Sequence, residues 1–113
     1  MTVLYVYGTL RPSTLDTVII KGQLFDLGWF PGLKMDLDGE VVCNRIEVDD
    51  IEKIDRYEGY REDDHEGSLY IRRPFLDGYI YEFNRDVSPA ARVLSGEWLE
   101  YTQEKRGRNA GYS

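Results

Sequence analysis

The sequence of 113 residues contains one cysteine, Cys43, so it cannot form a disulfide within the chain. This is typical of proteins kept in a reducing compartment. No apolar run approaches the ~20 residues that a membrane-spanning helix needs. No basic segment precedes the apolar residues 3–7, and no small-residue cleavage site follows them, so we expect no signal peptide. The sequence therefore predicts a cytoplasmic protein that makes no membrane contact.

Positive charge is also scarce, because 14 Lys and Arg face 21 Asp and Glu, a net charge of -7. A general nucleic-acid binder needs a basic surface that displaces counterions from phosphates. The basic group near the C-terminus, Lys105, Arg106 and Arg108, is too short to supply one, and we expect it to be solvated. Nucleic acid is therefore not an expected partner, whereas a small-molecule ligand remains open because net charge governs solubility more than sites.

Aromatic residues are abundant, with nine tyrosines and four phenylalanines, and hydrophobic residues make up 42% of the chain. This composition and length indicate one globular, β-rich domain. β-Branched and aromatic runs bounded by turn residues predict strands, and Asp-Gly pairs predict hairpin turns. We expect strands at residues 2–7, 17–25, 40–48, 68–75 and 79–83, with turns at 36–39 and 77–78.

One main helix is expected over residues 50–58, where Asp49 and Asp50 offer an N-cap and first-turn negative charge and Gly59 is the C-terminal stop. A short helix follows at 97–101. From Thr102 the chain is polar, so we expect a domain at residues 1–101 and a frayed polar tail at 102–113. Several short strands with one central helix predict an α+β domain, built on either a strongly curved sheet or a small barrel.

Glu58 is the candidate catalytic residue. At 100° per residue, Ile51, Ile54 and Glu58 share one stripe of the helix, with Glu58 within about 20° of Ile51. Burial beside these residues and a position at the negative end of the helix dipole both raise a carboxyl pKa. A carboxyl tuned toward neutrality can take and return a proton. The alternative is that Glu58 turns outward into solvent.

The turn at residues 7–11 is the candidate binding loop, because it directly follows an expected buried strand. Gly8 permits either a positive φ or a close backbone approach. Successive backbone N–H groups in such a turn can hold a carboxylate or an oxyanion. Arg11 either adds a charge-assisted hydrogen bond to an anionic substrate or is solvated. The alternative for Gly8 is an ordinary glycine at the end of a strand.

These segments also carry a family resemblance. The sequence VYGTLRP at residues 6–12 resembles the signature loop of the γ-glutamylcyclotransferase-like superfamily, and IDRYEGY at 54–60 resembles its segment ending in the catalytic Glu-Gly. Further similarity follows in the expected order. It lies at residues 21–32, 39–41, 70–73, 79–81 and 95–98.

The resemblance implies a fold and a chemistry. The fold is a small mixed β-barrel of five to six strands with one main helix packed against it. The free α-amine of a γ-glutamyl compound attacks its own γ-carbonyl, which gives 5-oxoproline and a released amine or amino acid, without metal or cofactor. Glu58 carries the proton. The implied substrate-binding residues are Tyr7, Gly8, Thr9, Leu10, Arg11 and Tyr70.

The substrate and the catalytic activity are not fixed by this resemblance. Members of the superfamily usually carry a longer segment after the signature loop, whereas here only residues 13–17 separate the loop from the next strand, which predicts a more open site. The alternative to an enzyme is a non-catalytic module that binds a small ligand in the same pocket. Neither the leaving amine nor the oligomeric state follows from the sequence.

Three other groups of residues allow a functional interpretation. The acidic run at residues 63–66 could bind a metal, although consecutive placement is not a common ligand spacing, and a solvated loop accounts for it better. Cys43 could be a nucleophile with His65 as its base, or a small buried residue. Trp29 and Phe30 could form a ligand wall, or serve core and loop packing.

Overall fold

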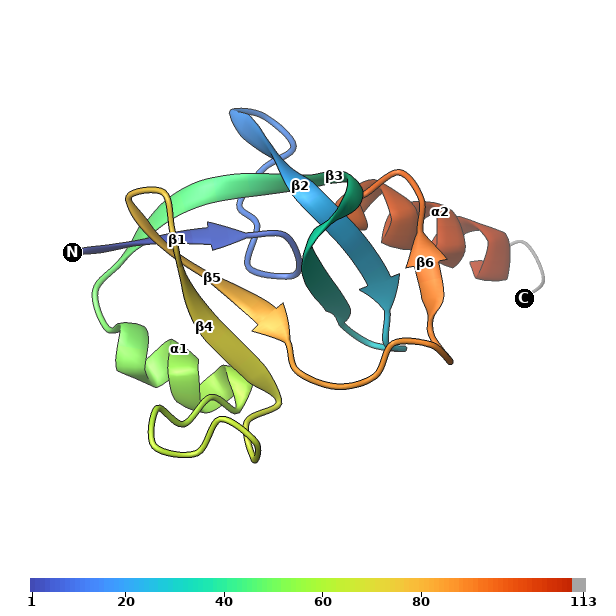
Figure 1. Ribbon diagram of the computed structural model, residues 1–113. Coiled ribbons are helices and arrows are strands. Elements are labelled where there is room, and N and C mark those ends of the chain that lie inside the picture. The colour runs from blue at the N-terminus through green and yellow to red at the C-terminus, as the bar shows by residue number, and fades with distance from the viewer. Residues whose placement is uncertain (111–113) are drawn as a thin grey trace.

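The computed structural model describes residues 1–110 of the chain, and the side chains of residues 1–105 (Figure 1). Its elements follow the order of an α+β domain, as predicted. They are β1 (Thr2–Val6), β2 (Thr17–Asp26), β3 (Pro31–Val48), α1 (Ile51–Glu58), β4 (Tyr70–Phe75), β5 (Gly78–Phe83), β6 (Ala91–Val93) and α2 (Trp98–Ala110). Within residues 1–110, no helix is both long and apolar enough to cross a membrane.

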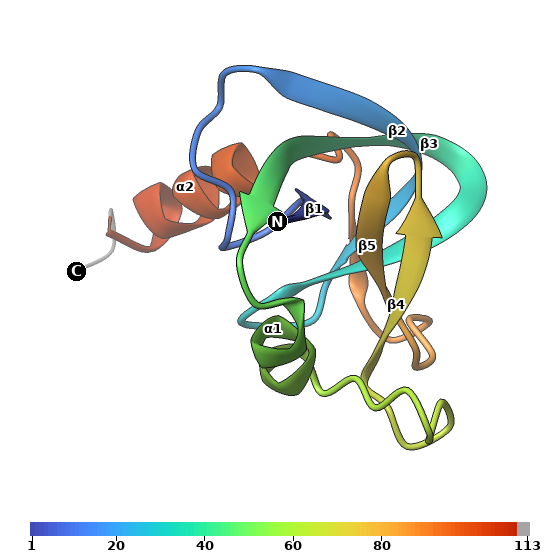
Figure 2. The same cartoon turned by 90° about the vertical axis from the view of Figure 1, so that its left-hand side faces the viewer.

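The strands form one mixed sheet in the order β4-β5-β1-β3-β2-β6. Neighbouring strands are antiparallel except β1 and β5, which are parallel. The sheet curls as the long β3 sweeps around the molecule (Figure 2). Its two edges, β4 and β6, do not pair with each other in the described chain, so the small barrel that the resemblance implies is not closed. Of the two forms expected from the sequence, the protein has the strongly curved sheet.

The expected hairpin turn at residues 36–39 is wrong, because these residues lie inside β3. β2 pairs Gly22 with Met35 and Lys21 with Glu40, so the four residues between Met35 and Glu40 form a bulge. Asp36 has φ 61° within this bulge. The residues that favour positive φ in a hairpin turn serve a bulge equally well. The β2–β3 connection is instead the turn at residues 27–30.

The core divides into two clusters because side chains alternate along β1. α2 contributes Trp98 to the first cluster, and α1 packs Ile51 and Ile54 against the second. The two helices lie at opposite ends of the molecule (Figure 1). The first cluster contains Tyr5, Tyr7, Ile20, Leu24, Leu33, Val41, Cys43, Ile80, Val93 and Trp98, and the second contains Leu4, Val6, Tyr60, Tyr70, Ile71, Tyr81 and Phe83.

Local signals fix both ends of α1 as predicted. The Asp50 carboxylate accepts a hydrogen bond from the Lys53 N–H at 3.2 Å, which satisfies one free donor of the first turn. Gly59 ends the helix in the left-handed conformation at φ 70°. This cap places Glu58 at the last position of α1.

α2 is longer than expected, since it continues from Trp98 through Ala110. The carboxylate of Glu97 accepts hydrogen bonds from the N–H groups at its start, and Lys105 forms an ion pair with Asp26 at 3.0 Å. These contacts hold a helix where we expected the polar tail to begin. The last three residues of that predicted tail, 111–113, lie outside the described residues.

Candidate active site

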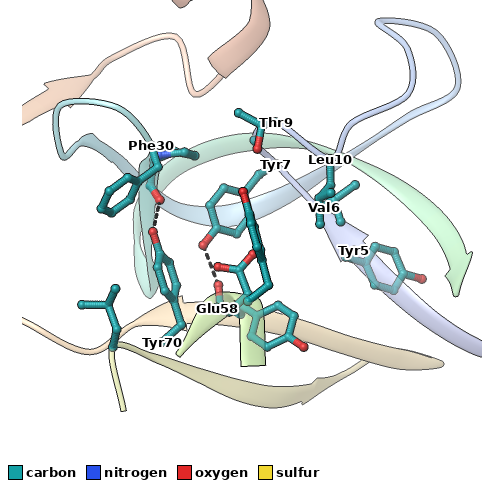
Figure 3. A pocket seen from close by; sticks show the side chains of 13 residues that line it. Tyr5, Val6, Tyr7, Thr9, Leu10, Phe30, Glu58 and Tyr70 are labelled. Carbon is teal, nitrogen blue, oxygen red and sulfur yellow. Dashed lines mark hydrogen bonds between the residues drawn. The ribbon is translucent and has the colours of Figure 1, made fainter. Parts of the chain in front are cut away.

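A cavity of about 280 Å³ opens where the end of β1, the β2–β3 turn, the end of α1 and β4 converge (Figure 3). In this view Glu58 and Tyr7 lie between Phe30 and Tyr70 on one side and Leu10 on the other. The lining residues are Tyr5, Val6, Tyr7, Gly8, Thr9, Leu10, Phe30, Pro31, Tyr57, Glu58, Leu69, Tyr70 and Tyr81.

Glu58 is half-buried and directed into this cavity, the inward direction that the helical wheel predicts. Within the described residues its carboxyl has no hydrogen-bond or ion-pair partner. Burial alone raises its pKa from 4.5 to about 7, because desolvation penalises the charged form. A carboxyl with this pKa exchanges protons readily near neutral pH.

Tyrosine hydroxyls surround Glu58, but they donate their hydrogen bonds to other acceptors. Tyr7 donates to the carbonyl oxygen of Tyr81 at 2.6 Å, and Tyr70 donates to that of Pro31 at 2.5 Å. Burial raises the pKa of Tyr7, Tyr70 and Tyr81, and the nearby Glu58 charge raises each further. These phenols therefore stay neutral, which leaves Glu58 as the group that can exchange a proton.

A polar cluster holds α1 against the β4–β5 hairpin one turn before Glu58. The Asp55 carboxylate accepts a hydrogen bond from the Tyr81 hydroxyl at 2.6 Å and forms an ion pair with Arg72 at 2.9 Å. The Arg72 guanidinium also lies over the rings of Tyr60 and Tyr79. This cluster fixes the end of α1 from which Glu58 projects.

The turn after β1 faces Glu58 across the cavity. Within this turn, the N–H of Arg11 donates to the carbonyl oxygen of Gly8 at 3.1 Å. No turn or side-chain hydrogen bond in the described chain uses the N–H groups of Gly8, Thr9 or Leu10. Of the two uses of Gly8 left open above, the structure shows close approach, because a Cβ there would lie 2.6 Å from Cγ of Pro31.

Comparison with known proteins shows the family of the chain that holds Glu58 and the facing turn. A family model described as "Gamma-glutamyl cyclotransferase, AIG2-like" matches residues 4–100. The chain belongs to this family. Two solved structures share its fold at 21% sequence identity. No curated protein gives a significant match.

The first of these structures is the crystal structure of the uncharacterized protein PH0828 from Pyrococcus horikoshii, with a TM-score of 0.66 over 95% of this chain and 98% of that one. The second is the solution structure of protein ytfP from Escherichia coli, with a TM-score of 0.62 over 88% of this chain and 98% of that one. Both are similar in fold to this member of the AIG2-like family.

Arg11 is the one predicted site residue that does not line the cavity of this family member. Its buried guanidinium donates to Oδ1 of Asn44 at 2.8 Å and to the carbonyl of Ser13 at 3.1 Å, and it forms an ion pair with Glu97. Arg11 thus joins the loop to the start of α2 and does not face the cavity. The short segment 13–17 is likewise absent from the lining.

Several lining residues were not predicted from the sequence as part of this site. The ligand-wall interpretation of Phe30 agrees with its place in the lining, where its ring lies 6.5 Å from that of Tyr70. Trp29, in contrast, is 92% exposed and does not line the cavity. The other lining residues to which the sequence assigned no role in a site are Tyr5, Val6, Pro31, Tyr57, Leu69 and Tyr81.

The acidic run at 63–66 forms a turn. Asp64 accepts a hydrogen bond from the Gly67 N–H at 2.9 Å, and the His65 ring lies 5.9 Å from that of Tyr60. Among residues 1–110, no group of three or more His, Cys, Asp or Glu side chains is placed to hold a metal ion. Cys43 is fully buried, and burial raises the pKa of its thiol to about 12, which keeps it protonated.

Proposed function

We propose that this protein is a γ-glutamyl cyclotransferase that converts a γ-glutamyl amine or γ-glutamyl amino acid into 5-oxoproline and the released amine. The observation that carries this proposal is the unpaired carboxyl of Glu58, which lines the cavity with a pKa of about 7. A protein that only binds a ligand gains nothing from burying a carboxylate without a partner. Membership of the family supports the same reaction class.

In the proposed reaction, Glu58 takes a proton from the substrate's α-amino group as the nitrogen attacks the γ-carbonyl carbon. A C–N bond forms and closes the five-membered ring, and the carbonyl oxygen becomes an oxyanion. Glu58 then gives the proton to the leaving nitrogen while the original amide C–N bond breaks. No water, oxidant or reductant is consumed, so the atoms balance with one proton shuttle.

Besides a proton carrier, the reaction needs a group that binds negative charge, and the turn at Gly8, Thr9 and Leu10 supplies it. Its N–H groups are not used by the turn itself, so they can bind the substrate carboxylate or the oxyanion. The nucleophile and electrophile belong to one molecule, so holding them in place removes much of the barrier. A single proton shuttle commonly adds a further factor of about 10² to 10⁴.

Turnover of γ-glutamyl compounds tests the proposal directly. The purified chain is incubated with γ-glutamyl amines and γ-glutamyl amino acids, and 5-oxoproline is quantified. We expect product from the wild type, and Glu58→Gln should lower kcat at least about 100-fold because the amide cannot exchange a proton. The matched control is Glu52→Gln, an exposed position on the same helix, which should keep its activity.

A binding module of the same fold gives a different result. In that case no compound yields 5-oxoproline, and a γ-glutamyl ligand still raises the melting temperature of wild type and of Glu58→Gln alike. This outcome would replace the enzymatic proposal.

A further inference from the structure

α2 is linked to two loops that border the cavity, although none of its described residues lines the cavity itself. It lies at the opposite end of the molecule from α1, which carries Glu58 (Figure 1). One loop is the turn after β1 at residues 8–11, and the other is the β2–β3 turn at residues 27–30, which brings Phe30 to the cavity. Each loop has its own polar link to α2.

The first link is the ion pair between Arg11 and Glu97, the residue that directly precedes α2. The Arg11 side chain is fully buried, and its main-chain N–H closes the turn by donating to the carbonyl oxygen of Gly8 at 3.1 Å. The Glu97 carboxylate also accepts hydrogen bonds from the N–H groups of Leu99 at 3.2 Å and Glu100 at 2.8 Å. One carboxylate therefore holds both the first turn of α2 and the end of the loop whose N–H groups face Glu58.

The second link is the carboxylate of Asp26, the last residue of β2. Its Oδ2 atom accepts hydrogen bonds from the Tyr101 hydroxyl at 2.7 Å and from Nζ of Lys105 at 3.0 Å, and both donors belong to α2. Its Oδ1 atom accepts a hydrogen bond from the Gly28 N–H at 2.8 Å. Asp26 therefore joins α2 to the turn that carries Phe30.

The two loops also contact each other beside the cavity. A Cβ on Gly8 would lie 2.6 Å from Cγ of Pro31, so the backbone of one loop lies directly against the residue that follows the other. The carbonyl oxygen of Pro31 accepts the hydrogen bond of Tyr70 at 2.5 Å. Glu58, in contrast, is held through α1 and the Asp55 cluster, which do not involve α2. A shift of either loop therefore changes the position of the turn N–H groups relative to Glu58.

These contacts assign a role to α2. Building on the proposed function, we propose that α2 is a positioning element of the site and that Arg11, Glu97 and Asp26 are its positioning residues. The two links set the distance between the turn that binds negative charge and the carboxyl that carries the proton. Both groups must act on one substrate, and an error of about 1 Å in such an arrangement can lower the rate about 100-fold.

Variants of Glu97 test the first link. Glu97→Gln removes the charge that faces Arg11, and we expect kcat/KM for 5-oxoproline formation to fall at least about tenfold. Glu97→Asp keeps the charge and a capping carboxylate on a shorter side chain, so kcat/KM should fall at least about threefold; this variant decides the question if Glu97→Gln does not fold. The matched control is Glu100→Gln, the same change at an exposed position of α2, which should keep the wild-type value.

A double variant tests the second link. Tyr101→Phe combined with Lys105→Gln removes both donors that α2 offers to Asp26, and we expect kcat/KM to fall at least about threefold. Lys21→Gln, an exposed position on the same strand as Asp26, controls for the lost positive charge and should leave kcat/KM unchanged.

The pH dependence of kcat/KM separates positioning from general loosening. A displaced turn lowers the maximum but leaves the midpoint at the pKa of Glu58, about 7, because the end of α1 stays in place. Loosening of the whole fold would hydrate the Glu58 carboxyl and move its pKa down toward 4.5.

Amide hydrogen exchange, followed by NMR, needs no substrate. In Glu97→Gln, and in Glu97→Asp, we expect the Arg11 N–H to exchange at least about tenfold faster while the N–H groups of β1 keep their rates. In the double variant we expect the same acceleration at the N–H of Leu27, which donates to the carbonyl oxygen of Phe30 at 3.0 Å.

The outcomes separate this role from the proposed function. If the variants keep the wild-type kcat/KM, or if exchange at Arg11 and Leu27 rises no more than in β1, α2 only stabilises the fold and the positioning role is wrong, although the chain remains a cyclotransferase. If the wild type yields no 5-oxoproline from any γ-glutamyl compound, the proposed function is overturned, and the exchange rates alone decide whether α2 holds the two loops.

Discussion

Replacing Glu58 by Gln should make the protein more stable at pH 8 while it removes the proposed activity. The wild-type carboxyl has a pKa of about 7 in the folded protein and an ordinary value of 4.5. The folded state therefore holds this proton more tightly than the unfolded state. The resulting contribution to stability is complete below pH 4.5, is lost as the pH rises toward 7, and is absent above it.

The size of the effect follows from the same displacement. A pKa raised from 4.5 to about 7 corresponds to about 3 kcal/mol, of which about 2.5 kcal/mol is lost between pH 5 and pH 8. Glu58→Gln carries no titrating proton and keeps the shape of the side chain. Its free energy of unfolding relative to wild type should therefore rise by the same amount, about 2.5 kcal/mol, between pH 5 and pH 8.

Urea unfolding of wild type and Glu58→Gln at both pH values measures this difference. Glu52→Gln, on the exposed face of α1, is the control for a lost negative charge. If the stability difference between wild type and Glu58→Gln is the same at pH 5 and pH 8, then burial does not perturb Glu58, and the argument for its proton exchange fails with it.

Two further substitutions test the parts that hold Glu58 in place. Asp55→Ala should lower the free energy of unfolding by about 2 kcal/mol in urea, since it leaves the Tyr81 hydroxyl and the Arg72 guanidinium without their partner; a loss under about 0.5 kcal/mol would mean that the cluster does not hold α1. Gly8→Ala should cost about 1 to 3 kcal/mol because its Cβ would meet the Pro31 ring at 2.6 Å, and an unchanged melting temperature would show that the turn can move aside.

Local signals predicted α1 and the direction of Glu58. The cap at Asp50, the stop at Gly59 and the apolar stripe through Ile54 all lie within ten residues of one another. Such short-range features depend little on the remainder of the chain, so the sequence alone is enough to place them. The family resemblance, and not a local signal, predicted that the turn after Tyr7 lies in the same pocket as Glu58. The roles of the N–H groups of this turn remain a prediction.

Long-range contacts explain what the sequence did not predict. Whether the sheet closes depends on the distance between β4 and β6, and β6 has only three residues, too few for an alternating pattern. The direction of Arg11 is set by Asn44 and Glu97, which are 33 and 86 positions away. The polar sequence after Tyr101 is typical of a frayed tail, but the ion pair between Lys105 and Asp26 joins it to the sheet.

The features that we assign to function are those that oppose stability. Glu58 is half-buried without a partner, and the Tyr7 and Tyr70 hydroxyls around it donate to backbone carbonyls instead of to its carboxyl. A hydrogen bond from either tyrosine would favour the charged form and lower the pKa of Glu58. The fold keeps this carboxyl unsatisfied by giving each neighbouring donor another acceptor. A purely structural carboxylate would be expected to have such a partner, which is why the stability gain in Glu58→Gln and its loss of turnover should occur together.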